Sequence, residues 1–166
     1  MEYLLQKGSL SIRRAVRSDA PAIADLIMGL AVYEHMPECC HATVPMLEES
    51  IFDRGEAKVL IAEYDGEPAG FSLYFYNYST WLAKKGLYLE DLFVKPEMRG
   101  KGIGKSLLQT LARIAVEEDC GRFEWSCLDW NEPSIQFYKS MGAVPMEDWT
   151  MYRVTGDALT KLAGQE

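Results

Sequence analysis

The feature that most constrains the fold of this chain is a strong strand that runs into a glycine-rich loop and then into an amphipathic helix. The strand is predicted over residues 87–94, which read LYLEDLFV, and the helix over residues 105–118, where leucine and isoleucine recur on one face. The loop between them, residues 95–104, contains three glycines. A further strand is predicted at residues 122–128, so a helix joins two successive strands and implies a parallel crossover. The sequence therefore predicts an α/β or α+β fold with a mixed sheet.

The rest of the chain supplies further strands and helices. They are a strand over residues 11–16, a helix that Ser18 or Asp19 caps and Pro37 stops, a helix that Thr43 caps and Gly55 ends, strands over residues 59–62 and 69–76, a short helix that Asn131 caps and Gly142 ends, a strand over residues 149–154, and a short helical tail. No repeat or low-complexity segment interrupts this order, and 166 residues suit one domain and are few for two. We therefore expect a single domain over residues 1–166, with a core of about residues 11–155.

The charge balance limits the classes of partner. The chain carries 17 Lys and Arg against 25 Asp and Glu, a formal net charge of −8, which argues against nucleic acid because phosphate binding needs a basic surface. The same balance is compatible with a cationic small molecule, and also with acidity that serves solubility alone. No run of about twenty apolar residues is present, so we expect no membrane span. We expect a cytoplasmic location. The four cysteines form no CxxC pair and the two histidines are isolated, so no metal site is predicted.

The glycine loop has the composition of a phosphate cradle. Glycines let backbone N–H groups approach a ligand, the following helix adds unpaired donors at its N-terminus, and Arg99 and Lys101 add positive charge. A Walker A loop requires a glycine where Arg99 stands, and GxGxxG fails in either register. The pattern R/Q-x-x-G-x-G/A fits residues 99–104 completely. A nucleotide site built on residues 104–106 stays open as an alternative.

Residues 99–104 resemble the coenzyme A pyrophosphate loop of the Gcn5-related N-acetyltransferases, and the order of elements from residue 11 to residue 154 resembles that family's fold. Residues 87–104 are similar to the signature of the spermidine/spermine N1-acetyltransferase branch. Three shorter segments, residues 78–81, 128–131 and 162–164, are similar to its thialysine N-acetyltransferase-like members. The resemblance covers nearly the whole chain. It implies a mixed, mostly antiparallel sheet with a splayed parallel pair of strands, flanked by helices.

The resemblance also implies where acetyl-CoA, the expected co-substrate, would bind. Backbone groups beside the splayed pair would contact the pantetheine arm and thioester, the glycine loop would hold the pyrophosphate, and the short helix would add further contacts. By position these residues are Leu92, Phe93, Val94, Arg99, Gly100, Lys101, Gly102, Ile103, Gly104, Lys105, Asn131, Glu132, Pro133, Ser134 and Tyr138. Tyr138 matches the family's catalytic tyrosine, and its phenol, with an ordinary pKa near ~10, can donate a proton to the departing thiol. A packing role beside Phe137 is the alternative for Tyr138.

Acetyl transfer to an amine needs a negatively charged side chain that binds the cationic amine, and a group that accepts the proton of the amine. Glu90 is the candidate for both tasks, while its neighbour Asp91 faces the other side of the strand unless a bulge intervenes. The resemblance places substrate contacts at Tyr33, Glu34, Glu90, Glu124, Trp125 and Ser126, with one more acidic contact loosely on Glu147 or Asp148.

The segment before the strong strand adds candidates by residue type. Ser79 and Thr80 carry hydroxyls suited to a substrate carboxylate or amide, and their alternative role is in a turn. Trp81 belongs to an aromatic group that suits cation–π contact with an amine or ordinary sheet packing. The other members of this group are Tyr74, Phe75, Tyr76 and Tyr78.

Together these residues predict an acetyl-CoA-dependent N-acetyltransferase that acts by direct transfer. The expected acceptor is a primary amine of a small molecule, either a thialysine- or lysine-like amino acid or a diamine or polyamine. Families of this kind form dimers with amine sites near the subunit interface, so a homodimer is expected. Two alternatives stay open, a protein N-acetyltransferase and a non-catalytic CoA-binding module.

Overall fold

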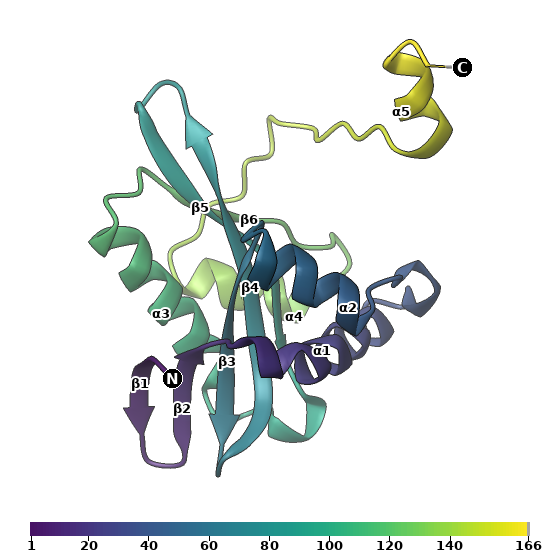
Figure 1. Cartoon of the computed structure of the whole chain (residues 1–166). Helices are drawn as coiled ribbons and strands as arrows, with labels where there is room; N and C mark the ends of the chain where they lie inside the picture. Colours follow the sequence, from purple (N-terminus) through teal and green to yellow (C-terminus); the bar gives the residue numbers. More distant parts are fainter. Residues whose placement is uncertain (166) are drawn as a thin grey trace. The chain divides into compact units, whose positions relative to one another are not determined.

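The computed structural model describes residues 1–165, which divide into two compact units, residues 1–126 and a unit that begins at Cys127. The first unit contains one six-stranded sheet in the order β1-β2-β3-β4-β5-β6 (Figure 1). The strands are β1 Tyr3–Lys7, β2 Leu10–Arg14, β3 Lys58–Tyr64, β4 Glu67–Ser79, β5 Lys84–Val94 and β6 Phe123–Trp125. All neighbouring pairs are antiparallel except β5 and β6, which are parallel. The predicted mixed sheet is therefore confirmed.

Most predicted helices are present. They are α1 Ala20–Tyr33, α2 Val44–Leu47 continued by η3 Glu48–Asp53, α3 Ile103–Glu117, α4 Glu132–Ser140 and α5 Gly156–Leu162, with short turns η1 Arg17–Asp19, η2 Pro37–Cys39 and η4 Pro96–Met98. Two predicted caps are confirmed, because the side chain of Thr43 accepts a hydrogen bond from the Met46 N–H and that of Asn131 accepts one from the Ser134 N–H. β1 was not predicted, since the sequence analysis began its first strand near Ser11.

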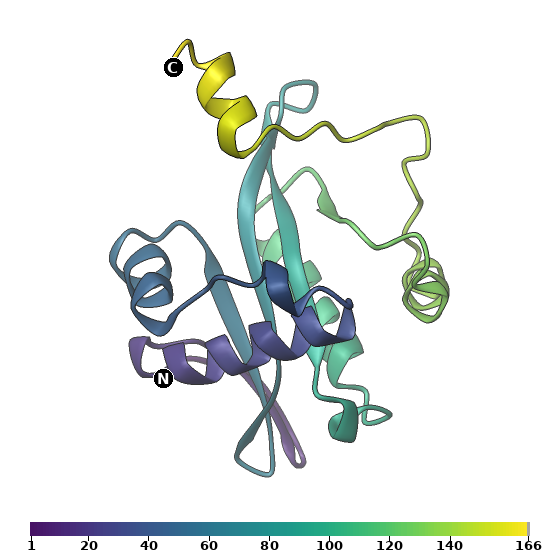
Figure 2. The same cartoon turned by 90° about the vertical axis from the view of Figure 1, so that its right-hand side faces the viewer.

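The sheet of the first unit is covered on both faces. α1, α2 and η3 bury their apolar side chains against one face, where they share a hydrophobic cluster with Val59, Ile61, Phe71 and Phe93. Figure 2 shows α1 crossing this face. α3 packs against the opposite face of β3, β4 and β5. α1 can lie close to β5 because Gly29 has no side chain, and a Cβ there would come within 2.8 Å of the Phe93 ring.

One predicted strand is absent. Residues 149–154 have the pattern of a strand but form none, and their large side chains are exposed, including Trp149, Met151 and Tyr152. A strand is defined by hydrogen bonds to a neighbouring strand, and within the described chain this segment has no such neighbour. The segment precedes α5 in the second unit. Among residues 1–165 there is no helix long and apolar enough to span a lipid bilayer.

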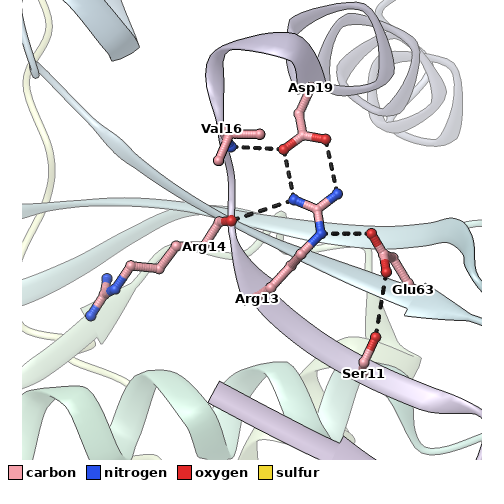
Figure 3. A network of polar contacts seen from close by, with 6 residues as sticks. All are labelled: Ser11, Arg13, Arg14, Val16, Asp19 and Glu63. Carbon is pink, nitrogen blue, oxygen red and sulfur yellow. Dashed lines mark hydrogen bonds and ion pairs between the residues drawn. The ribbon is translucent and has the colours of Figure 1, made fainter. Parts of the chain in front are cut away.

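A buried arginine ties β2, β3 and the start of α1 together (Figure 3). Arg13 is only 4% exposed, and its guanidinium donates to both carboxylate oxygens of Asp19, at 2.7 and 2.9 Å, and to Glu63 at 2.6 Å. Asp19 also accepts from the Val16 N–H at 2.7 Å. Burial alone would raise the pKa of Asp19, but these hydrogen bonds lower it below its ordinary value. The carboxylates of Asp19 and Glu63 therefore neutralise the charge of Arg13 in a site that is largely closed to water.

We expect Arg13→Met to destabilise the protein by about 3–5 kcal/mol, because it leaves two largely buried carboxylates without their cation. Urea unfolding at pH 7 measures the change. The matched control is Arg54→Met, since Arg54 is exposed and pairs with exposed Glu49 and Glu56, so its loss should cost less than about 1 kcal/mol. Equal losses in the two variants would contradict the structural role given to Arg13.

Candidate functional site

The pairing between the parallel strands β5 and β6 ends half-way along β5. They pair at Leu87 with Phe123, Tyr88 with Glu124 and Leu89 with Trp125, and the pairing then stops. β5 continues beside β4 as far as Val94. Residues 90–94 therefore keep strand geometry while one edge of their backbone has no strand partner in the described chain. This edge includes the predicted coenzyme contacts Leu92, Phe93 and Val94, and the predicted splayed parallel pair is confirmed.

A bulge lies where the strands part. Leu73 of β4 pairs with Asp91 and Tyr74 pairs with Leu89, so Glu90 has no partner on β4. A bulge redirects the side chains around it, which removes the simple alternation that would place Glu90 and Asp91 on opposite faces. The two carboxylates are close enough that the charge of Glu90 raises the pKa of Asp91.

Three carboxylates near the bulge interact through their charges. Burial, followed by the charges of Glu90 and Glu34, raises the pKa of Asp91 to about 7. Burial and the charge of Glu90 also raise the pKa of Glu34, which is the C-cap of α1. Across residues 1–165 none of the three carboxylates has a cationic side chain within ion-pair distance. The cluster therefore favours a bound cation or a proton at neutral pH.

The glycine loop at the end of β5 is shaped to receive an anion. Gly100 and Gly102 have φ of +79° and +75°, and the space that a Cβ would occupy at either residue is open. Gly102 is also the N-cap of α3, which has no side-chain cap, so first-turn N–H groups can face a ligand. Arg99 and Lys101 are exposed on the same loop. These features fit the phosphates of coenzyme A.

Tyr88, Glu124 and Ser126 occupy the α1-side face of the sheet, next to the carboxylates. The hydroxyl groups of Tyr88 and Ser126 lie 2.9 Å apart, and the Tyr88 ring packs on Phe75 with centroids 5.1 Å apart. Glu124 already has partners, since it forms an ion pair with Arg122 at 2.7 Å and accepts a hydrogen bond from Asn77 at 3.3 Å. Tyr88 was missed by the sequence analysis.

Two groups of predicted substrate contacts lie apart from the carboxylates. Trp125 follows Glu124 on a strand, so its side chain points to the other face, where it packs on Phe123. Ser79, Thr80 and Trp81 lie at the far end of the β4–β5 hairpin, where the Ser79 hydroxyl accepts a hydrogen bond from the Leu82 N–H. Ser79 lies six positions along β4 from Leu73, the partner of Asp91, which is roughly 20 Å of strand. Within one chain, the hairpin end and the carboxylates do not meet.

The remaining predicted residues belong to the second unit. Asn131 is buried and caps α4, with Glu132, Pro133 and Ser134 in the first turn of that helix. Tyr138 lies further along α4, half-buried, with its ring 5.5 Å from that of Phe137. Glu147 and Asp148 are exposed in the irregular segment that follows α4. Among residues 1–165 no three His, Cys, Asp or Glu side chains are grouped so as to hold a metal ion.

Comparison with known proteins identifies this arrangement. The sequence profile of the Acetyltransferase (GNAT) family matches residues 25–143. The chain belongs to this family. It is 35% identical to thialysine N-epsilon-acetyltransferase of Sus scrofa, over 95% of this chain and 99% of that protein. It is 50% identical to the L-ornithine N5-acetyltransferase NATA1 of Arabidopsis thaliana, over 55% of this chain and 40% of that protein.

Solved structures agree with the GNAT assignment. The integron cassette protein VCH_CASS6 of V. cholerae superposes with a TM-score of 0.80 at 29% identity, over 93% of this chain and 98% of that one. An aminoglycoside acetyltransferase from a soil metagenome, at 18% identity and a TM-score of 0.77, shares the fold. The protein is therefore an N-acetyltransferase, and the resemblance inferred from residues 87–104 is confirmed.

The strain in the carboxylate cluster should be measurable as a pH-dependent loss of stability. The folded-state pKa of Asp91, about 7, lies above its ordinary 3.8, so the stabilisation by its proton is complete below pH 4 and is lost as the pH rises through 7. Asp91→Asn removes this loss. We expect the variant to exceed the wild type in unfolding free energy by about 2–4 kcal/mol at pH 8 and to equal it near pH 4.

Urea unfolding at the two pH values tests this expectation. Asp25→Asn is the matched control, because Asp25 is exposed on α1. A wild type as stable as Asp91→Asn at pH 8 would show that Asp91 carries no such strain.

Proposed function

We propose that residues 1–166 act as one acetyltransferase domain that transfers acetyl from acetyl-CoA directly to a primary amine of a small cationic molecule. The acceptor is a thialysine- or lysine-like amino acid, or a diamine or polyamine. The observation that carries the proposal is the three-carboxylate cluster without a cationic partner, placed where β5 parts from β6. The relatives named for activity on thialysine and on ornithine point to the same chemical class.

In this proposal the coenzyme is held by backbone and basic groups. The free edge of residues 92–94 receives the pantetheine arm, and the loop from Arg99 to Lys105 receives the pyrophosphate, with residues 131–134 adding contacts. When bound, acetyl-CoA supplies an activated acetyl thioester. An unpaired N–H near Leu92 or Phe93 is positioned to polarise a carbonyl oxygen, which lowers the barrier to attack.

Glu90 and Asp91 share the handling of the amine. An ordinary primary ammonium must lose a proton before it can attack, and a carboxyl with a pKa of about 7 exchanges protons readily at neutral pH. Glu34 and Glu90 attract the cation, and Glu90 accepts its proton, directly or through water, with Asp91 as a second acceptor beside it. Tyr138 donates its phenol proton to the departing sulfur.

An amine panel tests this function. We expect the purified protein to release free thiol from acetyl-CoA with thialysine, lysine, ornithine, 1,5-diaminopentane or spermidine, with the highest kcat/KM for a short dication or lysine analogue. Release is followed with a thiol reagent, and the product is identified by mass. An enzyme that binds CoA but acetylates none of these amines would favour the binding-module alternative, and activity confined to peptides would favour the protein N-acetyltransferase.

Tyr138→Phe is the mechanistic variant within the same assay. Loss of a general acid lowers kcat by about 10²-fold or more while the affinity for CoA is kept. The matched control is Tyr152→Phe, because Tyr152 is 91% exposed and lies outside the proposed site. Unchanged turnover in Tyr138→Phe would remove Tyr138 from the mechanism.

We propose also that the enzyme is a homodimer. Large apolar side chains are exposed at the β4–β5 hairpin end, where Tyr78, Trp81 and Leu82 are 60%, 93% and 53% exposed. A second group is exposed in the segment that contains Trp149 and Tyr152. Large exposed apolar side chains grouped in this way are typical of protein interfaces. Ser79, Thr80 and Trp81 do not reach the carboxylates of their own chain. In a dimer they would contact the amine bound to the other subunit.

Sedimentation equilibrium at tens of micromolar protein should give twice the chain mass of 18.8 kDa. Trp81→Glu should shift the protein toward the monomer, because it places a charge in the apolar contact. Val116→Glu on α3 serves as the control, since Val116 is also exposed, at 80%, but lies on another element. A wild type that sediments as a monomer would refute the dimer.

A further inference from the structure

Two basic side chains of the glycine loop, those of Arg99 and Lys101, rest on tyrosine rings. The guanidinium carbon of Arg99 lies 4.7 Å from the ring centroid of Tyr33, and the ammonium of Lys101 lies 4.9 Å from that of Tyr64. Both distances are within the range of a cation–π interaction. The two tyrosines come from different places, since Tyr33 is the last residue of α1 and Tyr64 the last residue of β3.

The Tyr33 ring is itself held in place. It packs against the hydrophobic cluster that includes Leu30 of α1 and Phe93 of β5. Arg99 has a second fixed contact, because its Nε donates to the Val94 carbonyl oxygen at 3.4 Å. An exposed arginine would ordinarily sample many rotamers, and two contacts reduce that freedom before any ligand binds.

Tyr33 also adjoins the carboxylate cluster. The next residue is Glu34, the C-cap of α1, whose backbone N–H donates to the Leu30 carbonyl at 2.9 Å. Glu34 lies within reach of the strand carboxylates, since the charge of Glu90 raises the pKa of Glu34 and the charge of Glu34 raises that of Asp91. A cation bound among them would relieve the repulsion between these like charges and favour one position of the α1 end. The same turn of helix therefore carries both the ring under Arg99 and a carboxylate of the amine site.

We propose that Tyr33 is a positioning residue whose ring holds Arg99 for the coenzyme pyrophosphate and couples coenzyme binding to binding of the cationic acceptor. This inference rests on the proposed function. Acceptor bound at Glu34 steadies the α1 end, and the steadied Tyr33 ring presents Arg99 to the phosphates. By thermodynamic linkage each ligand then increases the affinity for the other by the same factor. The role needs the aromatic ring, whereas the substrate contact predicted for Tyr33 would also use its hydroxyl.

Isothermal titration with CoA, alone and with saturating thialysine, tests the coupling. The wild type should bind CoA more tightly when thialysine is present. Tyr33→Leu should weaken CoA binding about 2–5-fold, the range expected for loss of one exposed cation–π contact, and should abolish the tightening by thialysine. Tyr33→Phe should behave as the wild type, because it keeps the ring. The double variant Arg99→Ala/Tyr33→Leu should bind CoA no more weakly than Arg99→Ala.

Tyr64→Leu is the matched control. It removes the other cation–π contact of the loop, so it should weaken CoA binding to a similar degree while the tightening by thialysine persists. The inference is overturned if the wild type shows no tightening, if Tyr33→Leu retains it, or if Tyr33→Phe fails like Tyr33→Leu. A wild type that binds no CoA would overturn the proposed function together with the inference, and thermal unfolding of each variant identifies general damage to the fold.

Discussion

The constraint on which the site depends is the end of the β5–β6 ladder after Leu89. A parallel pair that continued to Val94 would satisfy the backbone of residues 90–94 and leave no edge for a ligand. The bulge at Glu90 coincides with the end of the ladder and changes the direction of the neighbouring side chains. One local irregularity therefore exposes backbone donors, and it also brings Asp91 close enough to Glu90 for the two carboxylates to interact electrostatically. The remaining antiparallel sheet and the two helical layers hold this irregularity in place.

Although the net charge is −8, acidic and basic residues are separated from each other along one continuous segment of the chain. Glu90 and Asp91 lie on β5, and Arg99, Lys101 and Lys105 follow within the loop and the first turn of α3. A cationic amine and an anionic coenzyme would thus be attracted to opposite ends of the same strand–loop–helix unit. Opposite charges placed in this order bring two oppositely charged reactants toward one edge of β5, where the acetyl group must pass between them.

The sequence was most informative where function depends on local chemistry. The glycine loop and the caps at Thr43 and Asn131 were predicted because their residue types act on their immediate neighbours. A bulge entered the prediction only as a condition, because its position is a property of the register between β4 and β5, which no pattern within LYLEDLFV records. The alternation rule therefore separated Glu90 from Asp91 although the structure couples them. The opposite error occurred at residues 149–154, where an apolar pattern predicted a strand but the described chain supplies no partner for it.

The assigned roles of the site residues stay proposals for a related reason. Leu92, Arg99 and Glu90 were placed by family resemblance, and the structure shows only that the first unit arranges them around one strand edge. Tyr138 and Asn131 lie in the second unit, and their roles rest on the family resemblance. Tyr33 differs from these residues. It lies on α1, far from Arg99 in the sequence, so no local motif predicts the contact between the two side chains.

Arg13 and Asp91 illustrate two opposite uses of buried charge. Arg13 has two carboxylates and ideal hydrogen bonds, and its charge is satisfied in the folded state without any ligand. Asp91 has only like charges beside it, so the folded state holds it in an unfavourable environment above neutral pH. A fold can tolerate such a group only where other interactions exceed its cost. In the proposed function this cost falls when the cationic acceptor binds, so the energy lost in folding would reappear as affinity for the amine. The unpaired carboxylate is then a selective feature, since a neutral molecule of the same shape would bring no such relief.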